Sequence, residues 1–140
     1  MPRRIFIVDD EKIIADTLCA ILRCSGYDAR AFYDAESALT ACKDLRPEFV
    51  ISDVSMPGMN GIDMAVQLKD SLPACGVLLF SGQAGTLDLL EKAHRKGYDF
   101  ELLTKPVHPT DLLAKLEGAI RLPAVSPDTR KSGNAAPFRA

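Results

Sequence analysis

The chain has 140 residues, of which 47% are apolar and 26% charged, a balance that fits one soluble domain with its own hydrophobic core. The formal net charge of −2 means that no strong overall field favours nucleic acid or an anionic membrane as a partner. No apolar run approaches the roughly 20 residues that a membrane-spanning helix needs. The basic N-terminus lacks the apolar core of a signal peptide, so the expected compartment is the cytoplasm, without membrane insertion.

Short β-rich segments alternate with helical patterns along the chain. The predicted strands are 4–8, 28–32, 49–52, 77–81 and 100–104. After each strand, apolar residues recur every three or four positions, which is typical of an amphipathic helix. The five apolar helix faces comprise, in chain order, Ile14, Leu18, Ile21 and Leu22; Ala38, Ala41, Cys42 and Leu45; Ala65, Leu68 and Leu72; Leu90 and Ala93; and Leu113, Leu116 and Ile120.

Residues that begin or end helices stand between these segments. Asp34 and Asn60 can cap the starts of the second and third helices. Gly26 and Gly97 stand where the first and fourth helices should end, in the left-handed conformation that glycine favours. Pro109 fits the first turn of the fifth helix, where its missing N–H costs nothing.

Five repeats of strand and helix predict an α/β fold, with one five-stranded parallel sheet covered by helices on both faces. The first, third and fourth strands are the most uniformly apolar and are therefore expected in the centre, whereas the mixed second strand is expected at an edge. The tail 123–140 has three prolines, many small or polar residues and no periodicity, which predicts a disordered segment after a domain of residues 1–122.

The four cysteines show no CxxC spacing, and neither histidine stands near one of them. Reduced thiols in or near the core are therefore favoured over a disulfide framework or a zinc site. The cysteines are Cys19, Cys24, Cys42 and Cys75, and the histidines are His94 and His108.

Charged and polar residues follow four of the predicted strands where each strand ends. In a parallel sheet the carboxyl ends of the strands meet at one edge, where ligands bind. Clustered carboxylates repel one another unless a cation joins them, and Mg²⁺ favours such oxygen ligands. A lysine and a hydroxyl beside Mg²⁺ match a phosphoryl group, which one carboxylate could itself accept as an acyl phosphate. These residues are Asp9, Asp10 and Glu11, then Asp53, then Ser81 and Gly82, and finally Thr104, Lys105 and Pro106.

Each of these residues also has an ordinary structural explanation. Asp9 and Asp10 could cap the first helix, since anions favour helix N-termini. Asp53 could be a turn residue, Ser81 a loop hydroxyl and Lys105 a surface lysine. The common position at the same end of successive strands favours a shared site over four unrelated explanations.

With these residues, the chain resembles the receiver domain of bacterial two-component response regulators over about residues 4–122. The resemblance is carried by "IVDDE" after the first strand, "DVSMPGMNG" after the third, "FSG" after the fourth and "TKP" after the fifth. It implies a CheY-like, flavodoxin-like sheet with the strand order 2-1-3-4-5.

The resemblance also implies roles for the acidic residues. Asp53 is the expected phosphoryl acceptor, with a histidine kinase or a histidine phosphotransfer protein as donor. Mg²⁺ is the expected cofactor, held by Asp10, by Asp53, by the backbone carbonyl of Ser55 and, through water, by Asp9.

Further roles follow from the same resemblance. Lys105 is expected to pair with the phosphoryl oxygens, and Ser81 is the expected switch hydroxyl that turns inward to the phosphate. Pro106 is expected after a cis bond, which proline makes accessible. Ser55 and Gln83 occupy the positions that tune the lifetime of the acyl phosphate, and both are neutral and polar, so intermediate autodephosphorylation is expected.

One position departs from the family pattern. Leu102 occupies the place of the aromatic switch residue, and the stretch 97–105 is one residue longer than usual. Phe100 shares the strand face of Leu102 by period-two alternation and could partly substitute for the aromatic residue. The surface of the fourth helix, fifth strand and fifth helix is therefore expected to bind a downstream protein with an altered readout.

The leading hypothesis is a receiver that phosphorylation switches between partner-binding states, with no direct contact to nucleic acid. The chain is either a stand-alone receiver or a piece of a longer regulator, two cases that the sequence does not separate. A degenerate receiver that binds without phosphate is a second possibility. A haloacid-dehalogenase-type phosphatase is disfavoured because Asp9 and Asp10 are adjacent rather than two residues apart. A flavin binder is disfavoured because the acid cluster would repel a flavin phosphate.

Overall fold

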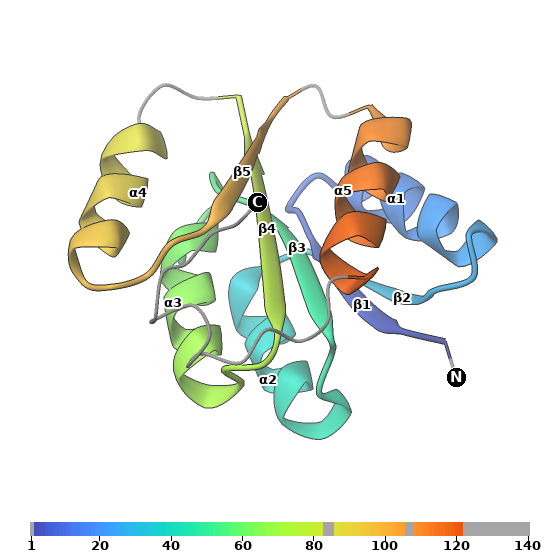
Figure 1. Cartoon of the computed structure of the whole chain (residues 1–140), viewed down its shortest axis with the longest axis horizontal. Coiled ribbons are helices and arrows are strands. Elements are labelled where there is room, and N and C mark those ends of the chain that lie inside the picture. Colours follow the sequence, from blue (N-terminus) through green and yellow to red (C-terminus); the bar gives the residue numbers. More distant parts are fainter. Residues whose placement is uncertain (1, 83–85, 106–107, 122–140) are drawn as a thin grey trace. The chain divides into compact units, whose positions relative to one another are not determined.

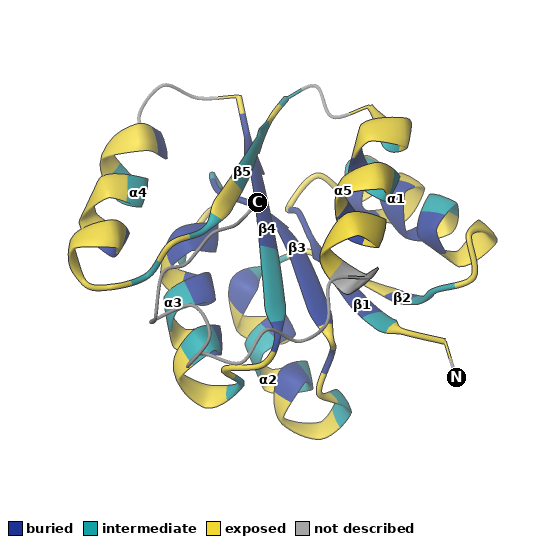
Figure 2. Cartoon of the chain, viewed as in Figure 1, coloured by how far each residue is buried: buried dark blue, intermediate teal, exposed yellow. Residues whose placement is uncertain are grey.

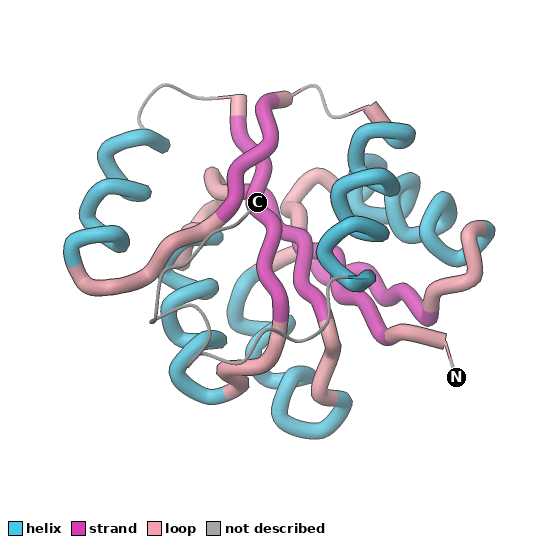
Figure 3. The backbone as a smooth tube through the Cα atoms, viewed as in Figure 1, coloured by secondary structure: helices cyan, strands magenta, loops and turns pink. Residues whose placement is uncertain are grey.

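The computed structural model describes residues 2–82, 86–105 and 108–121, with the backbone alone for 120 and 121. Helices and strands alternate along the chain (Figure 3). By its contacts the chain divides into two parts, Met1–Pro109 and Thr110–Ala140. The elements are β1 (Arg4–Val8), α1 (Lys12–Cys24), β2 (Asp28–Phe32), α2 (Ala35–Leu45), β3 (Phe49–Asp53), α3 (Gly61–Ser71), β4 (Gly76–Ser81), α4 (Thr86–Arg95), β5 (Glu101–Thr104) and α5 (Pro109–Arg121).

The strands form one parallel sheet in the order β2-β1-β3-β4-β5 (Figure 1). The predicted fold class and strand order are therefore confirmed, with β2 at one edge and β1, β3 and β4 in the interior. Asp53 pairs with Phe80, and Ser81 pairs with Thr104. This register places the ends of β3, β4 and β5 side by side at the carboxyl edge.

Both faces of the sheet are apolar, and β1 and β3 are buried along most of their length (Figure 2). Phe6, Val8 and Val50 lie on one face in a cluster with α2 and α3. Alternation places Ile5 and Ile7 on the opposite face, where α1 covers the sheet (Figure 1). Burial on both faces explains why the central strands read as continuous apolar runs.

A second cluster lies on the same side as α2 and α3, towards the β5 edge. It joins α3, α4 and β4, and includes Ile62, Ala65, Leu79 and Ala93. Because α3 contributes to both clusters, it connects the acidic end of β3 with α4.

The predicted helix boundaries have the expected chemistry. Asp34 accepts a hydrogen bond from the Ser37 N–H at 2.7 Å, and Asn60 accepts one from the Asp63 N–H at 2.8 Å. Gly26 and Gly97 adopt φ of 98° and 94°, the left-handed conformation of helix ends. Pro109 is the first residue of α5.

The buried face of α1 is rotated slightly from the predicted one. It consists of Ala15, Leu18, Cys19 and Leu22. The predicted Ile14 and Ile21 are only half-buried and lie at the margin of this face.

Three cysteines are buried, one is exposed, and none is in a disulfide. Burial raises the pKa of Cys42 to about 11 and that of Cys75 to about 12, so these thiols stay protonated near neutral pH. Among the described residues, no helix has both the length and the apolar composition needed to cross a bilayer.

Candidate functional site

The end of β1 delivers a buried carboxylate. Asp9 is fully buried, and its Oδ1 accepts a hydrogen bond from the Glu11 N–H at 2.9 Å. Glu11 is the N-cap residue of α1, and no side chain caps this helix, so capping does not account for Asp9 or Asp10. Within the described part of the chain, Oδ2 of Asp9 has no hydrogen-bond partner. A buried carboxylate oxygen without a hydrogen bond is costly, and a cation bound beside it would offset that cost.

Asp53 is the last residue of β3 rather than the first loop residue, and it is 4% exposed. The chain returns against it at Gly61, whose N–H donates to the Val54 carbonyl at 2.8 Å. A Cβ atom on Gly61 would lie only 2.1 Å from the Asp53 carbonyl oxygen. Glycine is therefore required where α3 begins, because any side chain would displace the backbone that carries Asp53.

Lys105 follows β5 and reaches across the carboxyl edge. Its Nζ lies 3.1 Å from Oδ2 of Asp53 and 4.0 Å from Oδ2 of Asp9. Its backbone N–H donates to the Ser81 carbonyl at 3.0 Å, which extends the pairing of β4 and β5 by one step. The ammonium group also lies 5.2 Å from the centre of the Phe80 ring. These contacts hold a positive charge directly beside Asp53.

Three carboxylates converge on one point. Asp9, Asp10 and Asp53 each offer an oxygen, and these oxygens lie within 4.8 Å of one another. Asp9 and Asp53 are buried and Asp10 is exposed. Two of the three carboxylates border a cavity of about 410 Å³, whose lining includes Asp10, Glu11, Asp53, Ser55, Gly82 and Lys105. A hard divalent cation with oxygen ligands and retained waters fits this donor set.

Burial sets the proton affinity of the two inner carboxylates. Desolvation raises the pKa of Asp9 to about 6, against the opposing hydrogen bond from Glu11. Desolvation also raises the pKa of Asp53, and the hydrogen bond from Lys105 partly offsets this effect. A cation at the cluster would stabilise both ionised forms.

Ser81 points its hydroxyl towards α4. Its Oγ lies 2.5 Å from Oγ1 of Thr86, and both residues are buried. Thr86 is the first residue of α4, and no sequence motif identified it. The only sequence feature that could have identified Thr86 is a hydroxyl residue five positions after Ser81, at the start of a predicted helix. That feature does not show that the two hydroxyl groups are in contact in the fold.

Leu102 lies away from the carboxylate cluster. It pairs with Leu79 of β4 and packs with Phe100 against the cluster of α3 and α4. The predicted common face of Phe100 and Leu102 is therefore present. Gln83 and Pro106, to which modulating and switch roles were assigned, lie outside the described residues.

A family model described as the response regulator receiver domain matches residues 5–117. The chain belongs to the response regulator receiver family. The resemblance seen in the sequence is thereby confirmed, and this receiver domain is part of two-component phosphorelay signalling. Neither the dehalogenase-type nor the degenerate alternative is favoured.

Curated relatives include DNA-binding response regulators. The receiver is 34% identical over 122 residues to the DNA-binding response regulator MtrA of Mycobacterium tuberculosis, covering 86% of this chain and 52% of that protein. It is 32% identical over 117 residues to the transcriptional regulatory protein FixJ of Bradyrhizobium diazoefficiens, covering 84% of this chain and 56% of that protein. The chain thus matches only about half the length of these relatives.

Solved receiver structures have the same fold. A CheY-like receiver domain from Methanospirillum hungatei superposes with a TM-score of 0.79 at 27% identity, covering 86% of this chain and 94% of that one. The receiver of an HD-domain protein from Pseudomonas fluorescens superposes with a TM-score of 0.78 at 27% identity, covering 86% of this chain and 95% of that one. The BeF₃-activated receiver domain of DrrB superposes with a TM-score of 0.72 at 26% identity, covering 86% of this chain and 98% of that one.

Proposed function

We propose that this receiver accepts a phosphoryl group on Asp53 from a phosphohistidine donor, a histidine kinase or a histidine phosphotransfer protein. The observation that carries the proposal is the position of Asp53 itself. Its carboxylate borders a cavity, is paired with Lys105 at 3.1 Å and lies beside two further carboxylates. An aspartate that only formed a turn or capped a helix would need neither a paired lysine nor two neighbouring carboxylates.

The reaction is a displacement at phosphorus. An oxygen of the Asp53 carboxylate forms a bond to the phosphorus atom while the phosphorus–nitrogen bond of the donor breaks. The electron pair of that bond stays on the imidazole nitrogen, which takes up a proton. Lys105 stabilises the charge on the phosphoryl oxygens, because its ammonium group already lies within reach of Asp53. The later hydrolysis of the acyl phosphate returns Asp53 to its carboxylate form.

Mg²⁺ fits the acidic cluster. Asp10, Asp53 and the Ser55 carbonyl are the proposed direct ligands, and Asp9 is the proposed ligand through water. The buried Oδ2 of Asp9 supports this assignment, since it is an acceptor that receives no hydrogen bond from the described residues. When bound, the ion supplies positive charge to the phosphoryl oxygens.

Ser81, Ser55 and Gln83 complete the proposed site. Ser81 serves as the switch hydroxyl, and Ser55, half-buried at the cavity, acts with Gln83 on the lifetime of the acyl phosphate. A Gln83→Ala variant that hydrolyses its acyl phosphate at the wild-type rate would remove Gln83 from this set. Catalysis by the receiver is limited in this proposal to its own phosphorylation and dephosphorylation.

The downstream signal is proposed to leave through α4 and β5, on which a partner protein docks. Leu102 in place of an aromatic switch residue gives this surface a different readout. Phosphorylation is expected to change amide chemical shifts in residues 86–105, and their constancy would contradict the proposal. The expected compartment remains the cytoplasm on the sequence alone.

The proposal is tested by incubating the protein with acetyl phosphate and Mg²⁺ and measuring the intact mass. Wild type and an Asp44→Asn variant, which loses an exposed carboxylate of α2, are expected to gain one phosphoryl group. Asp53→Asn is expected to gain none. An adduct on Asp53→Asn, or the absence of one on wild type, would remove Asp53 as the acceptor.

A further inference from the structure

The hydrogen bond between Ser81 and Thr86 connects the phosphorylation site with α4. Ser81 is the last residue of β4, and Thr86 is the first residue of α4. Their hydroxyl oxygens are 2.5 Å apart, and the side chains are 5% and 3% exposed. Either oxygen can be the donor. Water has little access to this pair, so loss of the bond would leave a buried hydroxyl to be satisfied elsewhere.

The bond directs Ser81 away from the cavity. The described residues that line the cavity include Asp53, Gly82 and Lys105, but not Ser81. The neighbouring Lys105 is nevertheless close to Ser81, because its backbone N–H donates to the Ser81 carbonyl. A rotation about the Cα–Cβ bond of Ser81 changes the direction of its hydroxyl without any displacement of the strand.

The Thr86 hydroxyl and a phosphoryl group on Asp53 are unequal acceptors for a hydrogen bond from Ser81. Phosphoryl oxygens on Asp53 are anionic and accept hydrogen bonds only, and charge-assisted bonds are stronger than a bond between two neutral hydroxyls. Staggered positions of a serine oxygen lie about 2.4 Å apart, so a rotation to a new rotamer breaks a contact of 2.5 Å unless α4 follows.

We propose that Thr86 is a positioning residue that holds Ser81 in its resting orientation. This proposal rests on the proposed function. When Asp53 is phosphorylated, the Ser81 hydroxyl breaks its hydrogen bond with Thr86 and forms one with a phosphoryl oxygen, and the first turn of α4 rearranges in response. The signal thereby reaches α4 through a hydroxyl pair at its N-terminus.

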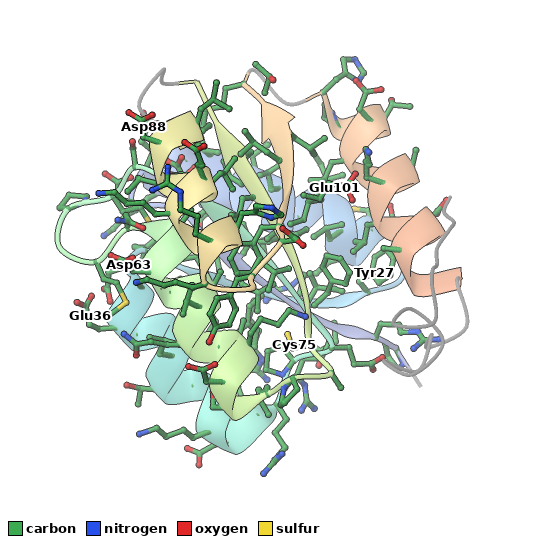
Figure 4. The ribbon with its side chains drawn as sticks, turned by 60° about the vertical axis from the view of Figure 1, so that its left-hand side comes forward. Tyr27, Glu36, Asp63, Cys75, Asp88 and Glu101 are labelled. Atoms are coloured by element: carbon green, nitrogen blue, oxygen red, sulfur yellow. The ribbon has the colours of Figure 1, made fainter. Side chains whose placement is uncertain are left out.

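The surroundings of Thr86 explain what the rearrangement changes. The residue next to it, Leu87, is 68% exposed, and Asp88 lies in the same first turn of α4 (Figure 4). Ala93, further along α4, is buried in the cluster that contacts Leu102. Ala93 anchors the second half of the helix, so a rearrangement of the first turn would alter the exposed surface at Leu87 and Asp88.

The test uses beryllium fluoride with Mg²⁺ as a phosphoryl mimic, titrated into the full chain by calorimetry. Thr86→Val keeps the shape of the side chain and removes its hydroxyl. It is expected to bind the mimic about two- to tenfold more tightly than wild type, the range that one neutral hydrogen bond supplies. Thr86→Ser keeps a hydroxyl and is expected to restore affinity towards that of wild type.

The second arm is a double-mutant cycle. In a Ser81→Ala background, Thr86→Val is expected to leave the affinity for the mimic unchanged, because the bond that it removes no longer exists. Amide shifts of residues 86–90 are expected to respond to the mimic in wild type and much less in Ser81→Ala. A purely structural role for Thr86 would change affinity equally in both backgrounds.

The outcomes separate this proposal from the proposed function. Wild type that fails to bind the mimic, or Asp53→Asn that binds it equally, overturns both. Wild-type binding with unchanged or weaker affinity in Thr86→Val, or with the same effect in the Ser81→Ala background, overturns the role of Thr86 alone.

Discussion

At the scale of single residues, Asp9 combines full burial with an oxygen that has no hydrogen-bond partner among the described residues. The sequence identified Asp9 as an acid after a strand, and a helix cap explained it equally well. The structure excludes the cap, because Asp9 contacts the Glu11 N–H and α1 has no side-chain cap. The burial of Asp9 and the distances to its neighbours depend on β1, β3 and the end of β5 together. The sequence around Asp9 alone therefore does not predict them.

Asp9→Asn is expected to stabilise the metal-free protein and to abolish most of its stabilisation by Mg²⁺. A pKa raised from 3.8 to about 6 corresponds to a cost of about 3 kcal/mol for the ionised form, of which asparagine should recover about 1–2 kcal/mol. Thermal unfolding in EDTA and in Mg²⁺ measures both effects. Asp44→Asn, with the same charge change at an exposed position, is the control, and a lower Tm of Asp9→Asn in EDTA would contradict the prediction.

The same carboxylate gives a pH dependence. Because the folded-state pKa of Asp9 is raised, its contribution to stability is fully present below the unfolded value near 4 and is lost as pH rises through about 6. Without metal, the free energy of unfolding of wild type should fall between pH 4 and 6 more steeply than that of Asp9→Asn. Urea denaturation across this range measures the two slopes, and equal slopes would rule out Asp9 as their cause.

At the scale of elements, the join between β3 and α3 positions the proposed acceptor. The sequence predicted the cap at Asn60 and the helix after it, because both are local patterns. It did not predict that α3 starts in contact with the Asp53 carbonyl, since that contact depends on the path of the intervening loop.

Gly61→Ala is expected to destabilise the fold by about 2–4 kcal/mol and to slow phosphorylation. Its Cβ would lie 2.1 Å from the Asp53 carbonyl oxygen, so strand or helix must shift. Gly118→Ala is the matched control, because nothing lies within 4 Å of its Cβ position and alanine favours a helix by about 1 kcal/mol. Urea denaturation compares the two variants, and a Gly61→Ala variant as stable as wild type would refute the close contact.

The connection from α4 to β5 carries a pH-sensitive contact. The hydrogen bond that the His94 ring donates to Asp99 raises the pKa of His94, in the last turn of α4. The stabilising contribution of this exposed pair is present below the unfolded histidine value and is lost as pH rises through the raised pKa. Asp99→Asn should lower the pKa of His94 in an NMR titration. Asp70→Asn removes a carboxylate that contacts Tyr98 instead and should leave His94 unchanged.

At the scale of the whole molecule, two apolar clusters share α3 and connect the acidic edge to α4 and β5. A ligand that binds only the folded state stabilises it by about 2.7 kcal/mol at one hundred times its Kd. Mg²⁺ with beryllium fluoride should therefore raise the Tm of wild type by about 5–10 °C. Asp44→Asn should show the same shift and Asp53→Asn almost none, and an equal shift in all three would place the ligand elsewhere.

By itself, the sequence determined the α/β class, the strand order through its family motifs, the helix caps and the set of acids, hydroxyl and lysine at one sheet edge. These features follow from local periodicity and from the rule that parallel strands end at the same edge. Only the tertiary structure decided that Oδ2 of Asp9 is buried without a hydrogen bond from the described residues, that Gly61 lies against β3 and that Thr86 bonds to Ser81. The surroundings of Asp9 depend on strands that are distant in the chain, and the other two contacts depend on how a loop brings a strand end against the start of the next helix. No short sequence pattern encodes either.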